Sequence, residues 1–336
     1  MKAIKIIDNI VRYTEVASIP TLSPHFNVLV KVHYAGICRT DIGVANGMVA
    51  HKDSIILGHE FCGTIEGFYN SEPEFECWRK GMAVSCNPMM FGEKDSDNMC
   101  GKDCDGAFAE YIAVPSAALI GIPNHLLSPL GAYLEPVAAA LAPVRFLTDL
   151  LEKDICVFGD NRIAELTLQV AHCMGHKEVR LVKNISELDS CKYDCIIETE
   201  PQYVNEYINA LRPGGTLILK SRSFESTELI FNNIAMKEIT IRGARYGDFY
   251  VASHILAATS LGVNGVLNTD SLLGSVYDLS EYEPAFIEAQ KKNSKKIFFK
   301  IQLRRRFSYL WRFINRTNMS VLPAFLTQIK ESISNE

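Results

Sequence analysis

The chain has 336 residues, of which 48% are hydrophobic and 22% are charged, and its formal net charge is −5. This composition is ordinary for a soluble globular protein, and the length suggests about two domains. No run approaches the roughly 18 consecutive apolar residues that a membrane-spanning helix requires, which excludes an integral membrane protein of that type.

The N-terminal residues Met1–Lys5 are predicted to form a strand, without the basic region, apolar stretch and cleavage site of a signal peptide. Ten cysteines stand at irregular spacings along the chain. In a large chain without a signal peptide, such cysteines indicate reduced thiols rather than a disulfide framework. We therefore expect a cytoplasmic protein.

Four potential metal ligands lie in the first 136 residues: Cys38, His59, Glu60 and Glu135. The first two follow apolar, strand-like runs that end in turns. A single cysteine or histidine is usually a core residue, but a thiolate, an imidazole and carboxylates together are the donors that hold Zn²⁺ and leave one position open. Such a site polarises an alcohol or carbonyl oxygen. The set therefore predicts a catalytic metal site in an oxidoreductase.

Four segments resemble those of the zinc-dependent medium-chain dehydrogenase/reductase family, the alcohol and polyol dehydrogenases. They are Ala35–Asp41, Gly58–Gly63, Asp105–Tyr111 and Leu134–Val137. The likeness runs, with gaps, from Met1 to about Ile301. It implies an α/β fold with a GroES-like β-rich catalytic domain, residues 1–137 and 272–301, and a shortened Rossmann-type doubly wound parallel sheet domain, residues 138–271.

The resemblance also implies roles for individual residues. Cys38 and His59 would be ligands of one catalytic zinc. Glu60 would be a third ligand that swaps on and off the metal or contacts it through water. Glu135 occupies a position that polyol-type members fill with a glutamate near zinc.

Three residues beside Cys38 would serve the reaction. Asp41 would accept the spare N–H of His59 and so fix its tautomer. Thr40 would pass the substrate proton outward while hydride leaves for the nicotinamide. Family members often continue this relay through a histidine where this chain has Gly43, so the relay must end in water or in another group. Arg39 would face the cofactor pyrophosphate, unless it is simply a solvated arginine.

A structural zinc, which many family members carry just before the Asp105 segment, is not expected. The chain offers only Cys86, Cys100 and Cys104 there, and three ligands at loose spacing do not complete a tetrahedral shell. Asp103 or Asp105 is a weak candidate for the fourth ligand.

The middle of the chain indicates a dinucleotide-binding strand, turn and helix. Asp154–Phe158 is a short apolar run, and Glu165–Met174 has apolar residues at helical spacing. Glycine is expected at the first, third and sixth positions of the turn between them. The turn is Gly159-Asp160-Asn161-Arg162-Ile163-Ala164, so Asn161 and Ala164 replace two glycines. We still assign Gly159, Asn161 and Ile163 to the cofactor site.

Lys183 ends the predicted second strand, Glu178–Lys183, where an acidic residue would normally bind the adenosine ribose. A lysine is compatible with a 2′-phosphate and so favours NADP over NAD, although a solvated lysine explains it equally well. Eleven residues then precede the next strand, Cys195–Glu198. They are too few for a helix, a strand and a connection, so we expect one edge strand and its helix to be missing.

The pattern then becomes regular again. The predicted elements are a helix at Val204–Leu211, a turn at Arg212–Gly215, a strand at Thr216–Lys220, a final nucleotide-domain strand at Lys237–Gly243, a helix from Tyr246 to Leu261, and strands within Val276–Ile301 that return to the first domain.

Residues 302–336 lie outside the resemblance and carry a charge of +4, from five arginines and one lysine against two glutamates. Phe307, Leu310, Trp311 and Ile314 would share one helical face, which predicts a basic amphipathic extension. It could pack against the chain's own acidic domain or a second copy, or contact a membrane surface. Nucleic acid is not expected as a partner, because the basic residues are confined to this tail.

Together these features predict a zinc-dependent, NAD(P)-linked alcohol, polyol or sugar-derivative dehydrogenase. The family's habit of pairing nucleotide domains implies a homodimer or homotetramer. The eroded glycine turn and Lys183 leave one alternative open, a non-catalytic descendant that keeps the fold for binding or assembly.

Overall fold

The computed structural model describes residues 1–70, 77–92, 98–147, 153–222, 226–292 and 294–301. The predicted tail, residues 302–336, lies outside these ranges. Within them, no helix is both long and apolar enough to cross a membrane.

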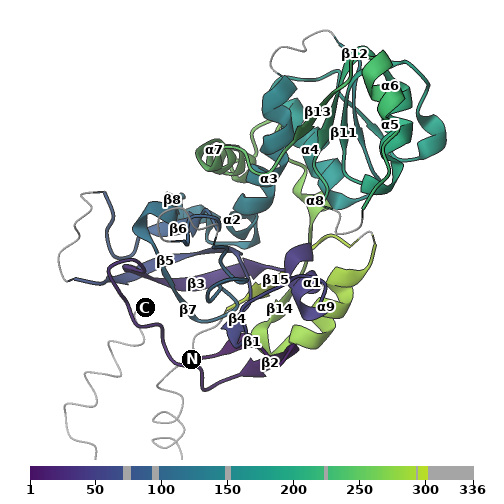
Figure 1. Ribbon diagram of the computed structural model, residues 1–336. Coiled ribbons are helices and arrows are strands. Elements are labelled where there is room, and N and C mark those ends of the chain that lie inside the picture. Colours follow the sequence, from purple (N-terminus) through teal and green to yellow (C-terminus); the bar gives the residue numbers. More distant parts are fainter. Residues whose placement is uncertain (71–76, 93–97, 148–152, 223–225, 293, 302–336) are drawn as a thin grey trace, which may run out of the picture. The chain divides into compact units, whose positions relative to one another are not determined.

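The N-terminal region and the last described strands form antiparallel-rich sheets (Figure 1). The elements here are β1 (Ala3–Ile7), β2 (Ile10–Thr14), β3 (Val28–Gly36), α1 (Arg39–Ala45), β4 (Ile55–Ile56), β5 (Glu60–Phe68), β6 (Ala83–Cys86), β7 (Tyr111–Val114), β8 (Leu119–Gly121), α2 (Pro129–Ala132), β14 (Leu273–Asp278), α9 (Tyr282–Gln290) and β15 (Lys296–Lys300). One sheet has the order β2-β1-β4, and the other β14-β15-β3-β5-β6-β8, with β7 also paired to β3.

The strands near the C-terminal end of the described chain complete the sheet that begins with β3. β15 pairs antiparallel with β3, Phe298 facing Gly36, and parallel with β14. Segments from both ends of the described chain therefore build one sheet, as the sequence predicted for the residues after Val276.

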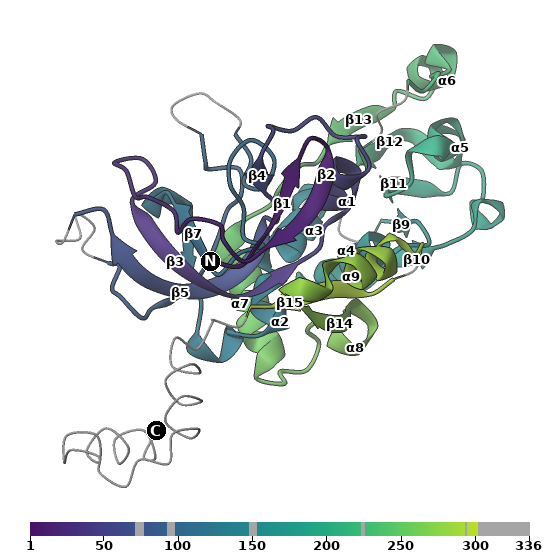
Figure 2. The ribbon, with the colours of Figure 1, turned by 90° about the horizontal axis from the view of Figure 1, so that it is seen from below.

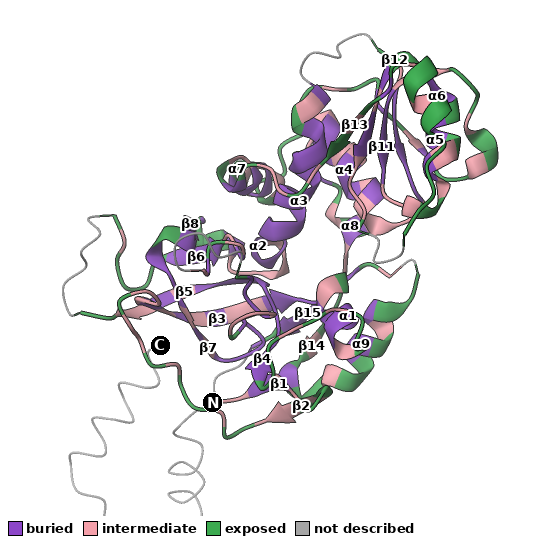
Figure 3. Ribbon diagram, viewed as in Figure 1, coloured by how far each residue is buried: buried purple, intermediate pink, exposed green. Residues whose placement is uncertain are grey.

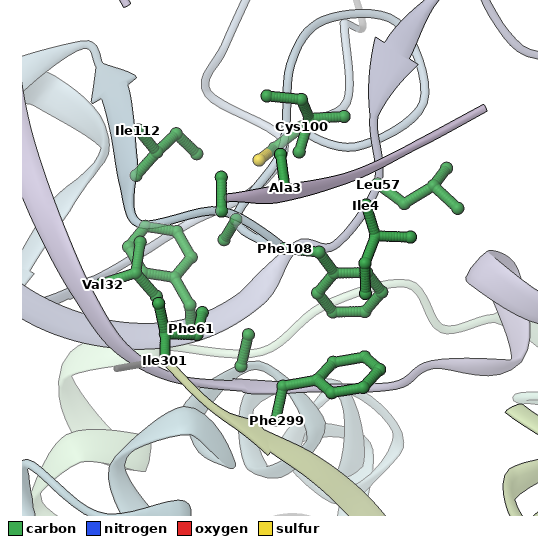
Figure 4. Close-up of a cluster of buried hydrophobic side chains, with 14 of the residues drawn as sticks. Ala3, Ile4, Val32, Leu57, Phe61, Cys100, Phe108, Ile112, Phe299 and Ile301 are labelled. Carbon is green, nitrogen blue, oxygen red and sulfur yellow. The ribbon is translucent and has the colours of Figure 1, made fainter. Parts of the chain in front are cut away.

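The core of this region is rich in aromatic rings (Figure 4). Phe108 is fully buried and packs edge-on against Phe299 and Phe286, with ring centroids 5.1 and 6.4 Å apart. Ile4 and Leu57 lie beside the Phe108 ring in Figure 4. Since these residues come from β1, β15, α9 and the loops, the ring joins distant parts of the chain.

The middle of the chain forms a parallel sheet with helices on both faces. Its elements are α3 (Leu134–Val144), β9 (Ile155–Phe158), α4 (Arg162–Cys173), β10 (Arg180–Val182), β11 (Tyr193–Glu198), α5 (Val204–Ala210), β12 (Leu211–Leu219), α6 (Phe231–Met236), β13 (Thr240–Gly243), α7 (Phe249–Ser260) and α8 (Thr269–Leu272). The sheet order is β10-β9-β11-β12-β13, and the strand labels in Figure 2 follow this order.

Side-chain alternation explains why both faces are covered. Ile155 and Val157 belong to the cluster with α3, α4 and α7, whereas Cys156 and Phe158 belong to the cluster with α5. Successive side chains of a strand point to opposite faces, so an apolar run of this kind needs a helical layer on each side. Figure 3 shows these strands as buried and much of α6 as exposed.

The sheet is short on one side, as predicted. Within the described residues, β10 is an edge strand, and a single 3-10 turn at Ile185–Glu187 connects it to β11. The shortened Rossmann-type sheet is therefore confirmed.

One predicted element differs in its detail. The turn expected at Arg212–Gly215 lies inside β12, which spans Leu211–Leu219. The pairing with β11 jumps from Tyr193 opposite Leu211 to Cys195 opposite Thr216. Gly214, with φ +76°, lies in the extra loop of this bulge. The Pro-Gly-Gly sequence does bend the chain as predicted, but the bend is a bulge within β12 and does not end the strand.

Truncation of the central ring tests this description of the core. Phe108→Ala should lower the free energy of unfolding by about 3–5 kcal/mol. The lost ring would leave a cavity in the core, and the strands and helix around it could move only partly to fill it. Phe231→Ala, at a ring that is 79% exposed, should change it by less than about 0.5 kcal/mol. Chemical denaturation of both variants measures this, and equal losses would contradict the packing.

Candidate active site

The sequence-predicted ligands Cys38, His59 and Glu60 meet at the edge of the β3–β5 sheet. One ligand atom from each residue lies within 4.8 Å of the other two. Gly36, at the end of β3, pairs with Glu60, at the start of β5, so the two strands bring the residues that follow β3 and those that begin β5 together. His59 and Glu60 are each 1% exposed.

Asp41 organises this cluster through three contacts. Its Oδ2 accepts the Cys38 N–H at 2.8 Å, and its Oδ1 accepts the Gly58 N–H at 3.2 Å. The same Oδ1 lies 3.5 Å from His59 Nδ1. Asp41 therefore caps α1 and faces the imidazole with one side chain, which agrees with the position expected of it beside His59.

The donor set fits a metal ion. His59 Nε2 is buried and has no hydrogen-bond partner among the described residues, while Asp41 faces the opposite ring nitrogen. A buried imidazole nitrogen without a partner is costly unless something else binds it. A thiolate, an imidazole nitrogen and a carboxylate oxygen around one point are the donors that Zn²⁺ takes.

The charges of these residues depend on each other. Burial opposes the Cys38 thiolate, but His59 and Lys296 outweigh this effect and lower the pKa of Cys38 to about 6. Burial likewise opposes a charged imidazole, but Asp41 and Cys38 raise the pKa of His59 well above its usual value. These shifts favour a Cys38 thiolate, the form of cysteine that binds metals, beside a protonated imidazole whose proton a metal ion would have to displace.

Lys296 is a functional residue that the sequence reading missed. It is 2% exposed, and its Nζ forms an ion pair with Glu60 Oε2. Burial raises the pKa of Glu60 to about 7, although the lysine acts in the opposite direction. A Cβ on Gly36 would stand 2.6 Å from Glu60 Oε2 and 2.9 Å from Lys296 Cε, so glycine leaves the space for the pair.

Glu135 lies close by, in the first turn of α3, but it is outside the group of three whose ligand atoms lie within 4.8 Å. It is 6% exposed, and burial together with Glu60 raises its pKa. The Tyr246 hydroxyl hydrogen-bonds to the Glu135 carboxyl. Tyr246 was not among the predicted site residues, because a tyrosine before a helix carries no signal of its own.

Thr40 and Arg39 lie on α1 beside the cluster. Thr40 Oγ1 is 3.8 Å from Cys38 Sγ and is partly exposed, as a group between the site and solvent would be. Arg39 is exposed and donates to the Lys292 carbonyl at 3.4 Å. Burial lowers the pKa of Arg39, and repulsion by the Arg162 guanidinium lowers it further. The two guanidinium groups therefore lie near each other.

Two of the three cysteines considered for a structural zinc contact backbone oxygens. Cys100 Sγ lies 3.5 Å from the Gly58 carbonyl, and Cys104 Sγ lies 3.8 Å from the Met99 carbonyl. Cys86 and Cys100 are buried, and burial raises both thiol pKa values. Protonated thiols are poor metal ligands.

The nucleotide turn lies where the sequence placed it, between β9 and α4. Gly159 has φ +146°, and Asn161 is the N-cap of α4, with its Oδ1 accepting the Ile163 and Ala164 N–H groups. Lys183 is exposed just after β10. Three N–H groups of this turn already bond to side chains of the protein: Asp160 N–H to Glu200, and the Ile163 and Ala164 N–H groups to Asn161.

Loss of the Lys296 charge tests the buried ion pair. Lys296→Met should lower the free energy of unfolding by about 3–5 kcal/mol at pH 8, because Glu60 loses its partner and must either stay charged and unpaired or take up a proton. The loss should shrink toward pH 5, where Glu60 takes up a proton. Lys80→Met, which breaks the exposed pair with Glu66, should cost less than about 1 kcal/mol. Denaturation at equal metal content is the measurement, and equal losses would contradict the assignment.

Comparison with known proteins agrees with this architecture. Residues 24–124 match the family model of the alcohol dehydrogenase GroES-like domain. The Aspergillus clavatus protein named "Probable D-xylulose reductase A" is 26% identical over 332 residues, covering 81% of this chain and 88% of that protein.

Solved structures show the same fold. Escherichia coli galactitol-1-phosphate dehydrogenase has a TM-score of 0.76 at 23% identity, covering 89% of this chain and 100% of that chain. An Escherichia coli CFT073 alcohol dehydrogenase in complex with NADH also has a TM-score of 0.76, at 22% identity, covering 89% and 99%. The resemblance to the zinc-dependent medium-chain dehydrogenase/reductase family is thereby confirmed: residues 24–124 match the GroES-like domain model, and the solved dehydrogenases share the fold.

Proposed function

We propose that the protein is a zinc-dependent oxidoreductase that interconverts an alcohol and a carbonyl group on a polyol or sugar derivative, coupled to a nicotinamide cofactor. The observation that carries the proposal is the buried cluster of Cys38, His59 and Glu60, in which His59 Nε2 has no hydrogen-bond partner among the described residues. The substrate class rests on the relatives, whose names refer to xylulose and galactitol 1-phosphate.

In this proposal Cys38 and His59 hold the zinc, and Glu60 and Glu135 supply carboxylates beside it. Bound zinc acts as a Lewis acid on the substrate oxygen. Asp41 keeps the His59 ring in place from the far side, at 3.5 Å from Nδ1. Lys296 forms an ion pair with Glu60 and would hold that carboxylate beside the metal.

Thr40 is the proposed proton carrier. Its hydroxyl lies 3.8 Å from the Cys38 sulfur, and its side chain is partly exposed. It can accept a hydrogen bond from a substrate hydroxyl at the metal and donate its own proton to water. Gly43 offers no side chain to extend the relay, so the proton passes directly to solvent.

The finer assignments are also proposals. Residues 1–137 and 272–301 form the catalytic domain, from which Arg39 faces the cofactor. Residues 138–271 form the cofactor site, which lies at the turn that holds Gly159, Asn161 and Ile163 and at Lys183. The catalytic zinc is the single zinc of the chain, and the protein assembles as a homodimer or homotetramer. It works in the cytoplasm, which the ten free cysteines support.

A non-catalytic descendant is the second candidate, and one observation favours it. Three backbone N–H groups of the nucleotide turn already donate to Asn161 or Glu200. A protein that no longer binds a cofactor does not require these N–H groups to be available to a phosphate. Metal analysis with a cofactor titration separates the two candidates, because zinc without cofactor binding would favour the descendant.

Removal of one zinc ligand tests the metal site. Cys38→Ser and His59→Ala should each lower bound zinc from about one per chain to near zero and abolish turnover, because too few donors remain. Xylulose and galactitol 1-phosphate are suitable first substrates, and elemental analysis gives the zinc content. Cys191→Ser, at an exposed thiol, is the control and should change neither. Turnover that persists without zinc would refute the proposal.

Charge reversal at Lys183 tests the preference for NADP. Lys183→Glu should shift the ratio of NADPH to NADH affinity toward NADH by about tenfold or more, because a carboxylate repels the 2′-phosphate and can bind a ribose hydroxyl. The matched control is Lys177→Glu, at an exposed lysine in the α4–β10 connection. Fluorescence titration measures both affinities, and an unchanged ratio would show that Lys183 does not contact the cofactor.

A further inference from the structure

The turn between β9 and α4 is bonded to the segment that follows β11, and Figure 2 shows these elements near one another. The Asp160 N–H donates to Glu200 Oε1 at 2.9 Å. The Ile163 and Ala164 N–H groups donate to Asn161 Oδ1 at 3.0 and 3.1 Å. Three backbone donors at the beginning of α4 therefore end on oxygen atoms of the protein itself.

The two side chains that accept these bonds are also joined to each other. Asn161 Nδ2 donates to Thr199 Oγ1 at 2.9 Å and lies 3.4 Å from Glu200 Oε1. Gln202 Nε2 donates to the other Glu200 oxygen at 3.2 Å. Glu200 and Asn161 are thus held in place from several sides.

Gly159 takes part in the same arrangement. A Cβ on Gly159 would stand 2.1 Å from Thr199 Oγ1 and 2.8 Å from Asn161 Nδ2. The glycine is therefore required for the approach of Thr199 and Asn161. The one glycine of the fingerprint that survives can be explained by contacts within the protein.

The beginning of a helix attracts anions, since its first N–H groups lack partners within the helix. In a dinucleotide-binding fold the cofactor pyrophosphate takes this place. Here a carboxylate oxygen and an amide oxygen take it. A pyrophosphate would have to displace both, and it would approach a negative charge that has no cationic partner among the described residues.

We propose that Asn161 and Glu200 form an internal substitute for the cofactor pyrophosphate, and that Glu200 sets the affinity of this chain for dinucleotides. The inference rests on the proposed function, since it concerns the cofactor of that same reaction. The carboxylate of Glu200 stands in for a phosphate oxygen on the Asp160 N–H. The cofactor pyrophosphate must displace the Glu200 carboxylate from the Asp160 N–H, and this displacement weakens cofactor binding.

Glu200→Gln is the direct test, because glutamine keeps an oxygen for the Asp160 N–H but removes the charge. The matched control is Glu206→Gln, an exposed glutamate in α5 that undergoes the same change of charge. Calorimetric titration of the full-length protein with NADPH, NADH and ADP-ribose gives the dissociation constants. All three ligands contain the pyrophosphate, and ADP-ribose lacks the nicotinamide.

Glu200→Gln should tighten the binding of all three ligands by the same factor, about tenfold or more, and Glu206→Gln should leave it unchanged. Asn161→Gly, which frees the Ile163 and Ala164 N–H groups, should tighten binding further if the variant folds. If the wild type binds and Glu200→Gln binds no more tightly, the inference is overturned and the dehydrogenase proposal stands. If no variant binds any of the ligands, both are overturned.

Discussion

A buried charged lysine and a buried charged glutamate are each costly unless they pair with one another. Lys296 and Glu60 are such a pair, each almost without exposure, and they come from strands at opposite ends of the described chain. Their contact passes over Gly36, whose missing side chain provides the room. Because Glu60 belongs to the metal cluster, the same pair that joins β5 to β15 also determines the charge at the site. Stability and chemistry therefore depend on one interaction.

The sequence predicted the ligand cluster because the donors stand next to recognisable strand ends. Cys38 and His59 follow apolar runs, and the end of β3 pairs with the beginning of β5, which brings the neighbouring residues together. Lys296 could not be found in this way. Alternation places it on the same strand face as Phe298, which is buried, but also as Lys300, which is exposed. Periodicity alone cannot say where along a strand the burial ends, and only the neighbouring β3 and its glycine decide it.

The nucleotide domain shows the opposite case. The glycine-poor turn was recognised from the sequence, but the state of its N–H groups depends on Glu200, which is distant in the chain. Asn161 was visible as a departure from glycine, and the short connection after Lys183 correctly indicated a missing edge strand. Glu200 carried no signal, since it lies after another strand, and nothing in its local sequence points to the turn. The fold brings the two together because parallel strands end at one edge of the sheet. Sequence patterns locate the elements of such a site but not the side chains that cross between them.

The position of β15 within its sheet has a consequence for synthesis on the ribosome. This strand lies between β14 and β3, and it is made after all the other described elements. Until it emerges, β3 has an open edge and Glu60 lacks its lysine. The nascent chain can thus fold its parallel sheet before its N-terminal metal ligands are fully enclosed, although chains generally fold from the N-terminus. Cys38, His59 and Glu60 are translated early, but the sheet beside them is completed late, when β15 pairs with β3.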